Sequence, residues 1–106
     1  MIFTRVIYKL VPLPGVSEEE FEAFMIGEVL PTIDTTYTRG GGIVGLAFHK
    51  DAKGDSEPNY LWAIDLETFG GSWFEARLEP AVEKLATVSS IEESGIYERL
   101  HAWSFR

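Results

Sequence analysis

The order of strand-like and helix-like segments constrains the fold of this chain more than any other feature. Segments rich in β-branched and aromatic residues predict strands at 2–11, 43–49, 60–67 and 96–105. Helical spacing of apolar residues predicts a helix over 18–30, a short helix over 73–79, and a further helix from Pro80 to about Val88. The resulting order, β-α-β-β-α-β, with short connections and right-handed crossovers, favours a four-stranded antiparallel sheet with the helices on one face. This α+β arrangement is the ferredoxin-like fold.

The helix starts carry the clearest local signals. Ser17 and Glu20 form a capping box, in which the serine hydroxyl accepts a hydrogen bond from the Glu20 amide. Ser72 and Glu75 repeat that pattern before the second helical region. Pro80 lacks an amide hydrogen, so we expect it to end one helix and to stand in the first turn of the next. The buried stripe of this region is predicted to be Leu78, Ala81, Val82 and Leu85.

Length and composition restrict the class of protein. The 106 residues fit a single domain, 1–106, and 45% hydrophobic residues are enough for a core. A net charge of −8 repels phosphate backbones and anionic lipids, so neither nucleic acid nor a membrane is an expected partner. The chain has no Cys, and its longest apolar stretch is too short to cross a bilayer. Arg5 and Lys9 interrupt any signal-like hydrophobic segment, and a cytoplasmic protein is expected.

The two faces of the predicted sheet both contain apolar residues. In the last strand one face would carry Leu100 and Ala102, and the other Arg99, His101, Trp103 and Phe105. In the second strand, Val44, Leu46 and Phe48 alternate with Ile43, Gly45 and Ala47. Helices can cover only one face, so the other would expose an apolar patch unless a partner covers it. We therefore expect a homodimer in which the two open sheet faces pack together.

The strand pair at 43–49 and 59–67, followed by the helical segment 72–80 that contains Pro80, resembles the dimeric α/β-barrel superfamily. This superfamily includes the antibiotic-biosynthesis monooxygenase-like proteins. The resemblance implies that two sheets pair as a dimeric α/β barrel. It also implies a cavity between sheet and helices that holds a small, mostly apolar ligand.

A polar group is predicted on the open face. In the ferredoxin-like strand order, Arg5 lies near Asp65 of the third strand and near His101 or Trp103 of the last. A carboxylate within the apolar segment 61–66 needs a partner, and Arg5 can supply a bidentate one. His101 could then act as a general acid or base near neutral pH. The alternative is structural: Arg5 and Asp65 form an ion pair, and His101 bonds across the dimer.

Aromatic residues are the candidate ligand-binding groups. Trp62, Trp73 and Trp103 would shape a cavity, and Tyr37 and Phe74 would stand at its mouth near the helix ends. Aromatic residues at strand or helix spacing equally serve as core, so both interpretations stay open.

Several other sites are not expected. Gly40, Gly42 and Gly45 match a dinucleotide-binding spacing, but the strand before and the helix after that such a site needs are missing. His49, Asp51 and His101 are the weak candidates for a metal site, and no metal or cofactor is predicted. The haem-degrading branch of the resembled superfamily uses an Asn in its first strand and a His in its second helical region. The cyclase-like branch uses His in its first strand and helices. This chain has no Asn or His in its predicted first strand and no His in its predicted helices.

Two classes of function remain. The first is an enzyme resembling the cofactor-independent monooxygenases, or an isomerase, acting on a small hydrophobic aromatic molecule. In it Arg5 would bind an oxygen substituent, while His101 or Asp65 moves a proton. The second is a non-catalytic dimeric protein that binds a small ligand, or one whose sheet face is used entirely for dimer packing. The sequence does not decide whether the chain is an enzyme.

Overall fold

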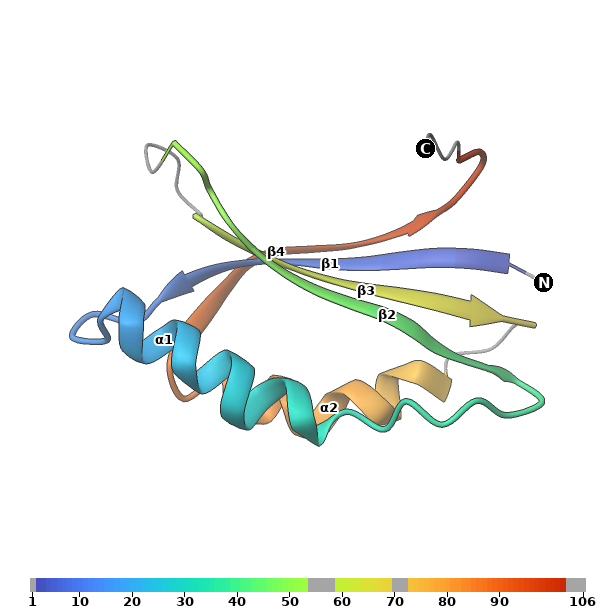
Figure 1. The fold of residues 1–106 in the computed structure, drawn as a ribbon, viewed down its shortest axis with the longest axis horizontal. Helices are drawn as coiled ribbons and strands as arrows, with labels where there is room; N and C mark the ends of the chain where they lie inside the picture. The colour runs from blue at the N-terminus through green and yellow to red at the C-terminus, as the bar shows by residue number, and fades with distance from the viewer. Residues whose placement is uncertain (1, 54–58, 70–72, 103–106) are drawn as a thin grey trace.

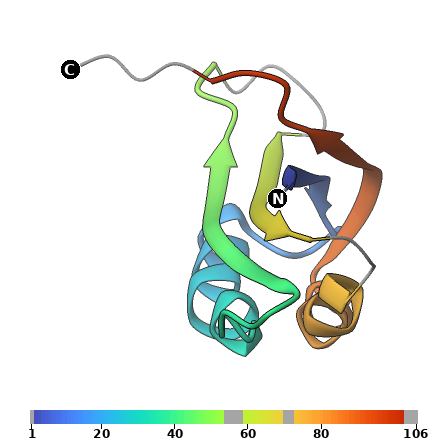
Figure 2. The ribbon, with the colours of Figure 1, turned by 90° about the vertical axis from the view of Figure 1, so that its right-hand side faces the viewer.

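The chain forms one four-stranded antiparallel sheet with its helices on one face. The computed structural model describes residues 2–53, 59–69 and 73–102. The strands are β1 (Ile2–Pro12), β2 (Gly41–Lys50), β3 (Tyr60–Thr68) and β4 (Ser89–Glu98), in the sheet order β2-β3-β1-β4. The helical layer lies beneath the sheet, with α1 on the β2 side and α2 on the β4 side (Figures 1 and 2). The ferredoxin-like prediction is confirmed.

The first helical region begins as the sequence predicts. Helix α1 (Glu18–Phe24) is capped by the Ser17 hydroxyl, which accepts from the Glu20 amide at 3.1 Å. The region then continues as a π-helical turn, η1 (Met25–Val29), and a 3₁₀ turn, η2 (Leu30–Thr32). The predicted helix is therefore present, but Pro31 lies inside its last, tighter turn. In this turn the Ile33 amide donates a hydrogen bond to the Leu30 carbonyl.

The second helical region differs from the prediction of two helices. Helix α2 is one element, Trp73–Leu85, with Pro80 inside it. The missing amide of Pro80 costs one hydrogen bond, but Leu78, Ala81 and Leu85 on either side are fully or almost fully buried. Packing on the sheet therefore holds one continuous helix through the proline. The predicted stripe is confirmed, with Val82 packed against its edge; the predicted cap Ser72 lies outside the described residues.

The last strand was predicted seven residues too late. β4 begins at Ser89 and ends at Glu98, so Arg99 to Ala102 are not part of it. Leu100, predicted to pack under the helices, is 92% exposed. The segment 89–95 contains serines and glutamates with weak strand preference, yet the backbone of β1 pairs with it from Ser89 onwards. An edge strand with a solvated side tolerates such residues.

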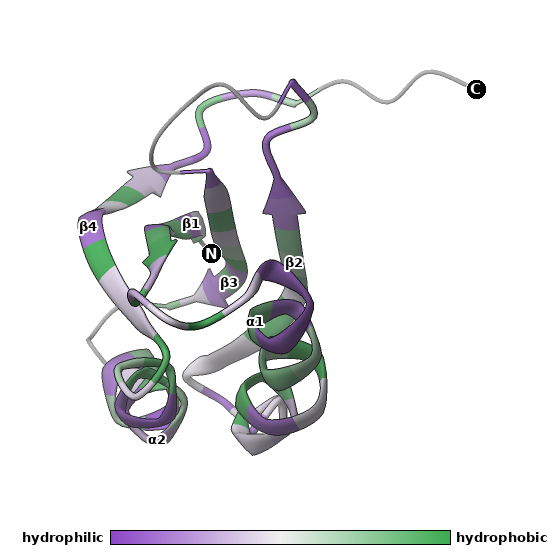
Figure 3. Cartoon of the chain, turned by 90° about the vertical axis from the view of Figure 1, so that its left-hand side faces the viewer, coloured by the Kyte–Doolittle hydropathy of each residue, from purple (hydrophilic) through white to green (hydrophobic). Residues whose placement is uncertain are grey.

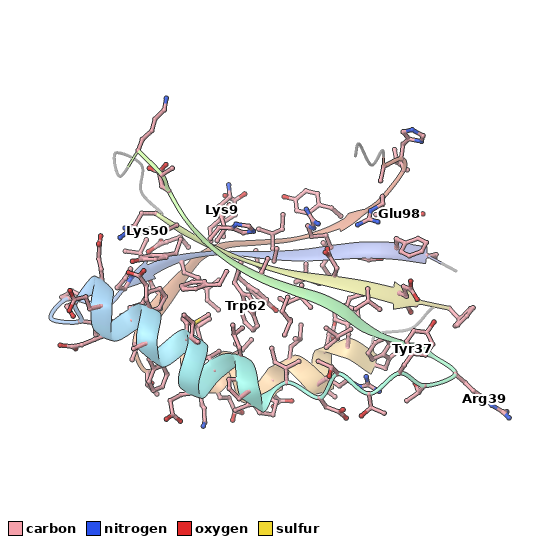
Figure 4. All side chains as sticks on the ribbon, viewed as in Figure 1. Lys9, Tyr37, Arg39, Lys50, Trp62 and Glu98 are labelled. Atoms are coloured by element: carbon pink, nitrogen blue, oxygen red, sulfur yellow. The ribbon has the colours of Figure 1, made fainter. Side chains whose placement is uncertain are left out.

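The core lies between the sheet and the helices. Its largest fully buried side chains come from β1, β3 and both helical regions, including Leu10, Trp62, Tyr60, Phe21 and Leu78. Figure 4 shows Trp62 in this layer and Lys9 on the opposite side of the sheet. The side of the sheet away from the helices is called the open face below.

A β-bulge in β2 decides which of its residues enter the core. Ile43 pairs with Leu66 and Gly45 with Asp65, so Val44 is the extra residue. The bulge places Ile43 on the same face as Leu46 and Phe48, which the simple alternation had separated. Val44 is 52% exposed instead. Along the unbulged part of the strand, Gly45 and Ala47 belong to the open face, as Arg5 and Ile7 do on β1.

Candidate functional site

The predicted partnership of Arg5 and Asp65 is present on the open face. The two residues are directly opposite each other in the β1–β3 register. Arg5 Nε donates to Asp65 Oδ1 at 2.7 Å, and Arg5 Nη2 donates to Oδ2 at 3.1 Å, which is a bidentate pair. The hydrogen bond from Arg5 lowers the pKa of Asp65, against a smaller opposing effect of burial. Asp65 is thus held as a carboxylate with both oxygens occupied.

The neighbour of Arg5 on the last strand is Tyr97, because β4 starts earlier than predicted. The Tyr97 ring lies back along the strand over Gly95, where an added Cβ would come within 2.7 Å of it. His101 lies beyond the strand end and is exposed, but it lines a cavity of about 430 Å³ together with Arg5, Tyr97 and Arg99. The structure therefore brings Arg5, Asp65 and His101 to one region.

The predicted aromatic residues are distributed differently. Trp62 is fully buried and stacks on Tyr8, with 5.3 Å between ring centroids. Trp73 and Phe74 are half-buried at the start of α2; the Trp73 indole donates to Thr68 and carries Arg77 over its ring. Tyr37 is half exposed and donates to Glu67. Trp103 lies outside the described residues.

The polar and the aromatic predictions thus fall on opposite sides of the sheet. Arg5 and Asp65 occupy the open face, while Trp62 and Phe74 lie on the helix side. Strand alternation explains the separation, since Trp62 is three residues before Asp65 on the same strand. Within a single chain, therefore, the polar and the aromatic residues do not form one binding site.

A groove lies on the helix side of the sheet. It runs between α2 and the strands β1 and β4, and we call it the α2–β4 groove. Two adjoining cavities of about 630 and 510 Å³ share Tyr8 and Glu75 in their walls. The remaining lining residues are Val6, Phe74, Ala76, Leu78, Glu79, Val82, Glu83, Ser94, Gly95 and Ile96. Figure 3, coloured by hydropathy, shows α2 beneath β4 at this side of the molecule.

The lining of the groove combines apolar side chains with the Tyr8 hydroxyl and with carboxylates of α2. Val6 is almost fully buried and Phe74 half-buried, whereas Ile96 remains 60% exposed at the outer wall. Burial, with a smaller contribution from the Glu75 charge, raises the pKa of Tyr8 above its ordinary value of 10.0. The hydroxyl therefore stays protonated at neutral pH and can donate a hydrogen bond. Ligand sites commonly combine such an apolar wall with a few polar groups.

Sequence reasoning missed Tyr8 and Glu75 as site residues. The signal for Tyr8 was available, because it faces Trp62 across the β1–β3 register that also places Arg5 opposite Asp65. Glu75 was interpreted only as half of a capping box. Its position on the flank of α2, next to the groove, follows from a single continuous helix and not from the two helices predicted.

Metal and membrane features are limited in the part of the chain that the structure describes. No group of three or more His, Asp or Glu residues there could hold a metal ion. None of the helices in residues 2–53, 59–69 and 73–102 has the length and apolar character to cross a membrane.

Comparison with known proteins shows the fold. No known family model matches the sequence, and no curated protein matches it significantly. Among solved structures, the crystal structure of HapK from Hahella chejuensis is similar, with a TM-score of 0.66 and 13% sequence identity. The similarity covers 97% of this chain and 98% of HapK. At this identity the likeness establishes the arrangement of strands and helices.

Proposed function

We propose that this domain binds a small hydrophobic aromatic molecule in the α2–β4 groove. The observation that supports this most directly is a groove in which apolar and aromatic side chains lie beside the protonated hydroxyl of Tyr8 and the carboxylates of α2. Phe74 and Tyr8 offer ring faces and edges to a planar ligand, and Val6 and Leu78 offer aliphatic contact. Tyr8 donates a hydrogen bond to an oxygen or nitrogen of the ligand.

We further propose that the domain acts on this molecule as a cofactor-independent monooxygenase-like or isomerase-like enzyme. Tyr8 and the Glu75 carboxylate are the polar groups that both cavities of the groove share. A carboxylate that accepts a proton and a phenol that donates one are the two groups that isomerisation of a phenolic or enolic substrate needs. In the oxidative variant, O₂ converts an activated CH₂ group of the substrate into a carbonyl. Both C–H bonds break and the carbon gives up four electrons to O₂; one oxygen atom becomes the carbonyl oxygen, and the other leaves as water with the two hydrogens.

A ligand titration tests the location of the site. Naphthols, hydroquinones and polyphenols are titrated against the purified protein while tryptophan fluorescence is recorded, because Trp62 stacks directly on Tyr8. We expect saturable quenching, with affinity reduced roughly three- to tenfold in Tyr8→Phe, which removes one hydrogen bond and keeps the ring. His101→Ala, on the other side of the sheet, is the matched control and leaves the affinity unchanged.

The opposite pattern would move the site. Binding that is lost in His101→Ala and unaffected in Tyr8→Phe would favour the open-face cavity of Arg5, Asp65 and His101 as the place of chemistry. Binding without oxygen uptake or isomerised product, for every ligand that binds, would favour the non-catalytic ligand-binding protein.

The second part of the proposal concerns the open face, which we propose to be covered by a second copy of the chain. Phe3, Leu61 and Tyr97 are between 37% and 54% exposed there. The centre of the face is formed by small residues, including Ala47 and Ala63, which let two backbones approach closely. Two such faces packed together would form the dimeric α/β barrel.

Sedimentation equilibrium tests the dimer. We expect the wild-type chain to be a dimer at micromolar concentration and Ala63→Arg to be a folded monomer. Ala63 is 9% exposed and lies opposite Ile7 and Ala47 on the open face, so an arginine there must extend into the space that a second sheet would occupy. Circular dichroism checks that the variant is folded. A wild-type chain that sediments as a monomer throughout the micromolar range would contradict the proposal.

A further inference from the structure

Three carboxylates stand along one side of the α2–β4 groove. Glu75, Glu79 and Glu83 follow one another at a spacing of four residues on α2, so they lie on one flank of the helix. All three line the larger cavity of the groove, together with Tyr8 and Val82. The lining of both cavities contains no Lys, Arg or His among the described residues.

These three carboxylates are exposed, and the described residues pair no cation with them. Of the salt bridges among the described residues, none includes Glu75, Glu79 or Glu83. Lys84, the only basic residue in the last turn of α2, lies 3.6 Å from Glu28 on the other side of the helix. Like charges four residues apart on a helix repel each other. A bound cation would remove this repulsion.

We infer that the groove selects a cationic aromatic molecule, such as a protonated amine or a protonated nitrogen heterocycle, over its neutral and anionic analogues. The inference rests on the proposed function, because the apolar groove supplies the site and the carboxylates decide only the charge of the ligand. Tyr8 and Phe74 add ring faces that attract a cation, an interaction that strengthens as water is excluded. The carboxylates repel an anionic ligand from the same position.

A charge-matched series of probes tests this inference. Isothermal calorimetry is used to measure binding of 2-naphthylmethylamine, 2-naphthalenemethanol and 2-naphthoate at neutral pH. These probes share one ring system and are respectively cationic, neutral and anionic. We expect the cation to bind about tenfold more tightly than the alcohol, which corresponds to a few solvent-exposed charge contacts. The naphthoate should bind most weakly, and added salt should reduce the preference for the cation.

Matched variants assign the preference to the groove. In Glu79→Gln/Glu83→Gln the ratio of cationic to neutral affinity should fall close to one. Glu19→Gln/Glu20→Gln on α1 changes the net charge of the protein equally, outside the groove lining and without breaking a described salt bridge, and should keep the ratio of the wild type. Loss of the preference in both variants would mean that the charge of the whole protein, and not the groove, selects the cation.

The results separate the two proposals. If the alcohol binds as tightly as the amine, or the naphthoate binds most tightly, the inference about charge is wrong, while the aromatic site proposed above still stands. If none of the three probes binds, the proposed function fails together with this inference.

Discussion

The two faces of the sheet are made by the same strands and yet differ in almost every physical respect. On the helix side, Trp62, Ile64 and Leu66 of β3 are at most 1% exposed. On the open face, Leu61 of the same strand is 37% exposed, and Asp65 forms an ion pair with Arg5, whose side chain is 49% exposed. The chain itself completes the packing of one face. The other face combines ion pairs in contact with water and apolar side chains that a partner could bury.

The groove arises where the helix side is incompletely covered. Helix α2 lies on the β4 side of the sheet but leaves Ile96 of this edge strand 60% exposed (Figure 2). Tyr8 is therefore half-buried, while its stacking partner Trp62 is completely buried. The indole N–H of Trp62 has no hydrogen-bond partner among the described residues. The helix side thus contains both the fully buried core and, at the edge of α2, the α2–β4 groove.

The largest expected difference is in the free energy of unfolding when a leucine of β3 is changed to alanine on the helix side or on the open face. Leu66→Ala removes a side chain that is 1% exposed, and it should lower the free energy of unfolding by about 2–5 kcal/mol. Leu61→Ala removes a side chain that already meets water, and it should cost less than about 1 kcal/mol. Urea unfolding followed by circular dichroism measures both, in the Ala63→Arg background so that association does not contribute.

Equal losses would contradict this division of the sheet. A loss for Leu61→Ala as large as that for Leu66→Ala, in the monomeric background, would mean that the open face is covered by the chain itself. A Leu61→Ala loss that appears only without Ala63→Arg would instead indicate burial of Leu61 in the dimer.

The next effect concerns the ion pair of the open face. Asp65→Asn should lower the free energy of unfolding at pH 7 by about 0.2–1 kcal/mol, the range for exposed pairs, because the Arg5 side chain is 49% exposed. The pKa of Asp65 in the folded chain lies below its ordinary value of 3.8. The pair therefore stabilises the fold above that value, and the stabilisation is lost as the pH falls through the folded pKa.

Urea unfolding of wild type and Asp65→Asn between pH 7 and pH 2.5 measures this difference. The two proteins should converge at the acidic end and differ most above pH 4. A difference that grows as the pH falls would have the wrong sign for a carboxylate stabilised by Arg5, and would contradict the assignment.

Sequence reasoning predicted the features that depend on local pattern or on topology. The capping hydroxyl of Ser17, the strands β1 and β3, and the Arg5–Asp65 pair all follow from spacing and from the ferredoxin-like strand order. The pair was predictable because two antiparallel central strands leave little freedom of register once the core face is known.

The features that were missed depend on tertiary packing. The bulge at Val44, the continuous helix through Pro80 and the early start of β4 each oppose the local preference of the residues involved. They are stabilised by contacts with strands and helices distant in the sequence. The groove was missed for the same reason, since its position depends on how α2 packs against β1 and the edge strand β4.

The smallest expected effect is that of Lys9→Gln on the free energy of unfolding. This effect tests whether water reaches the open face of the sheet. Lys9 Nζ and Glu93 Oε2 are 3.0 Å apart, with side chains 40% and 62% exposed. Lys9→Gln in the Ala63→Arg background should leave the unfolding midpoint unchanged at both low and high salt, since water solvates both charges equally well when they are apart. Without Ala63→Arg, packing of a second sheet would remove that water, and the loss of Lys9 would leave Glu93 buried without its partner. The destabilisation should then increase with protein concentration. A salt-sensitive loss already present in the monomeric background would mean that this ion pair is screened from water within a single chain, and the open face would not be open.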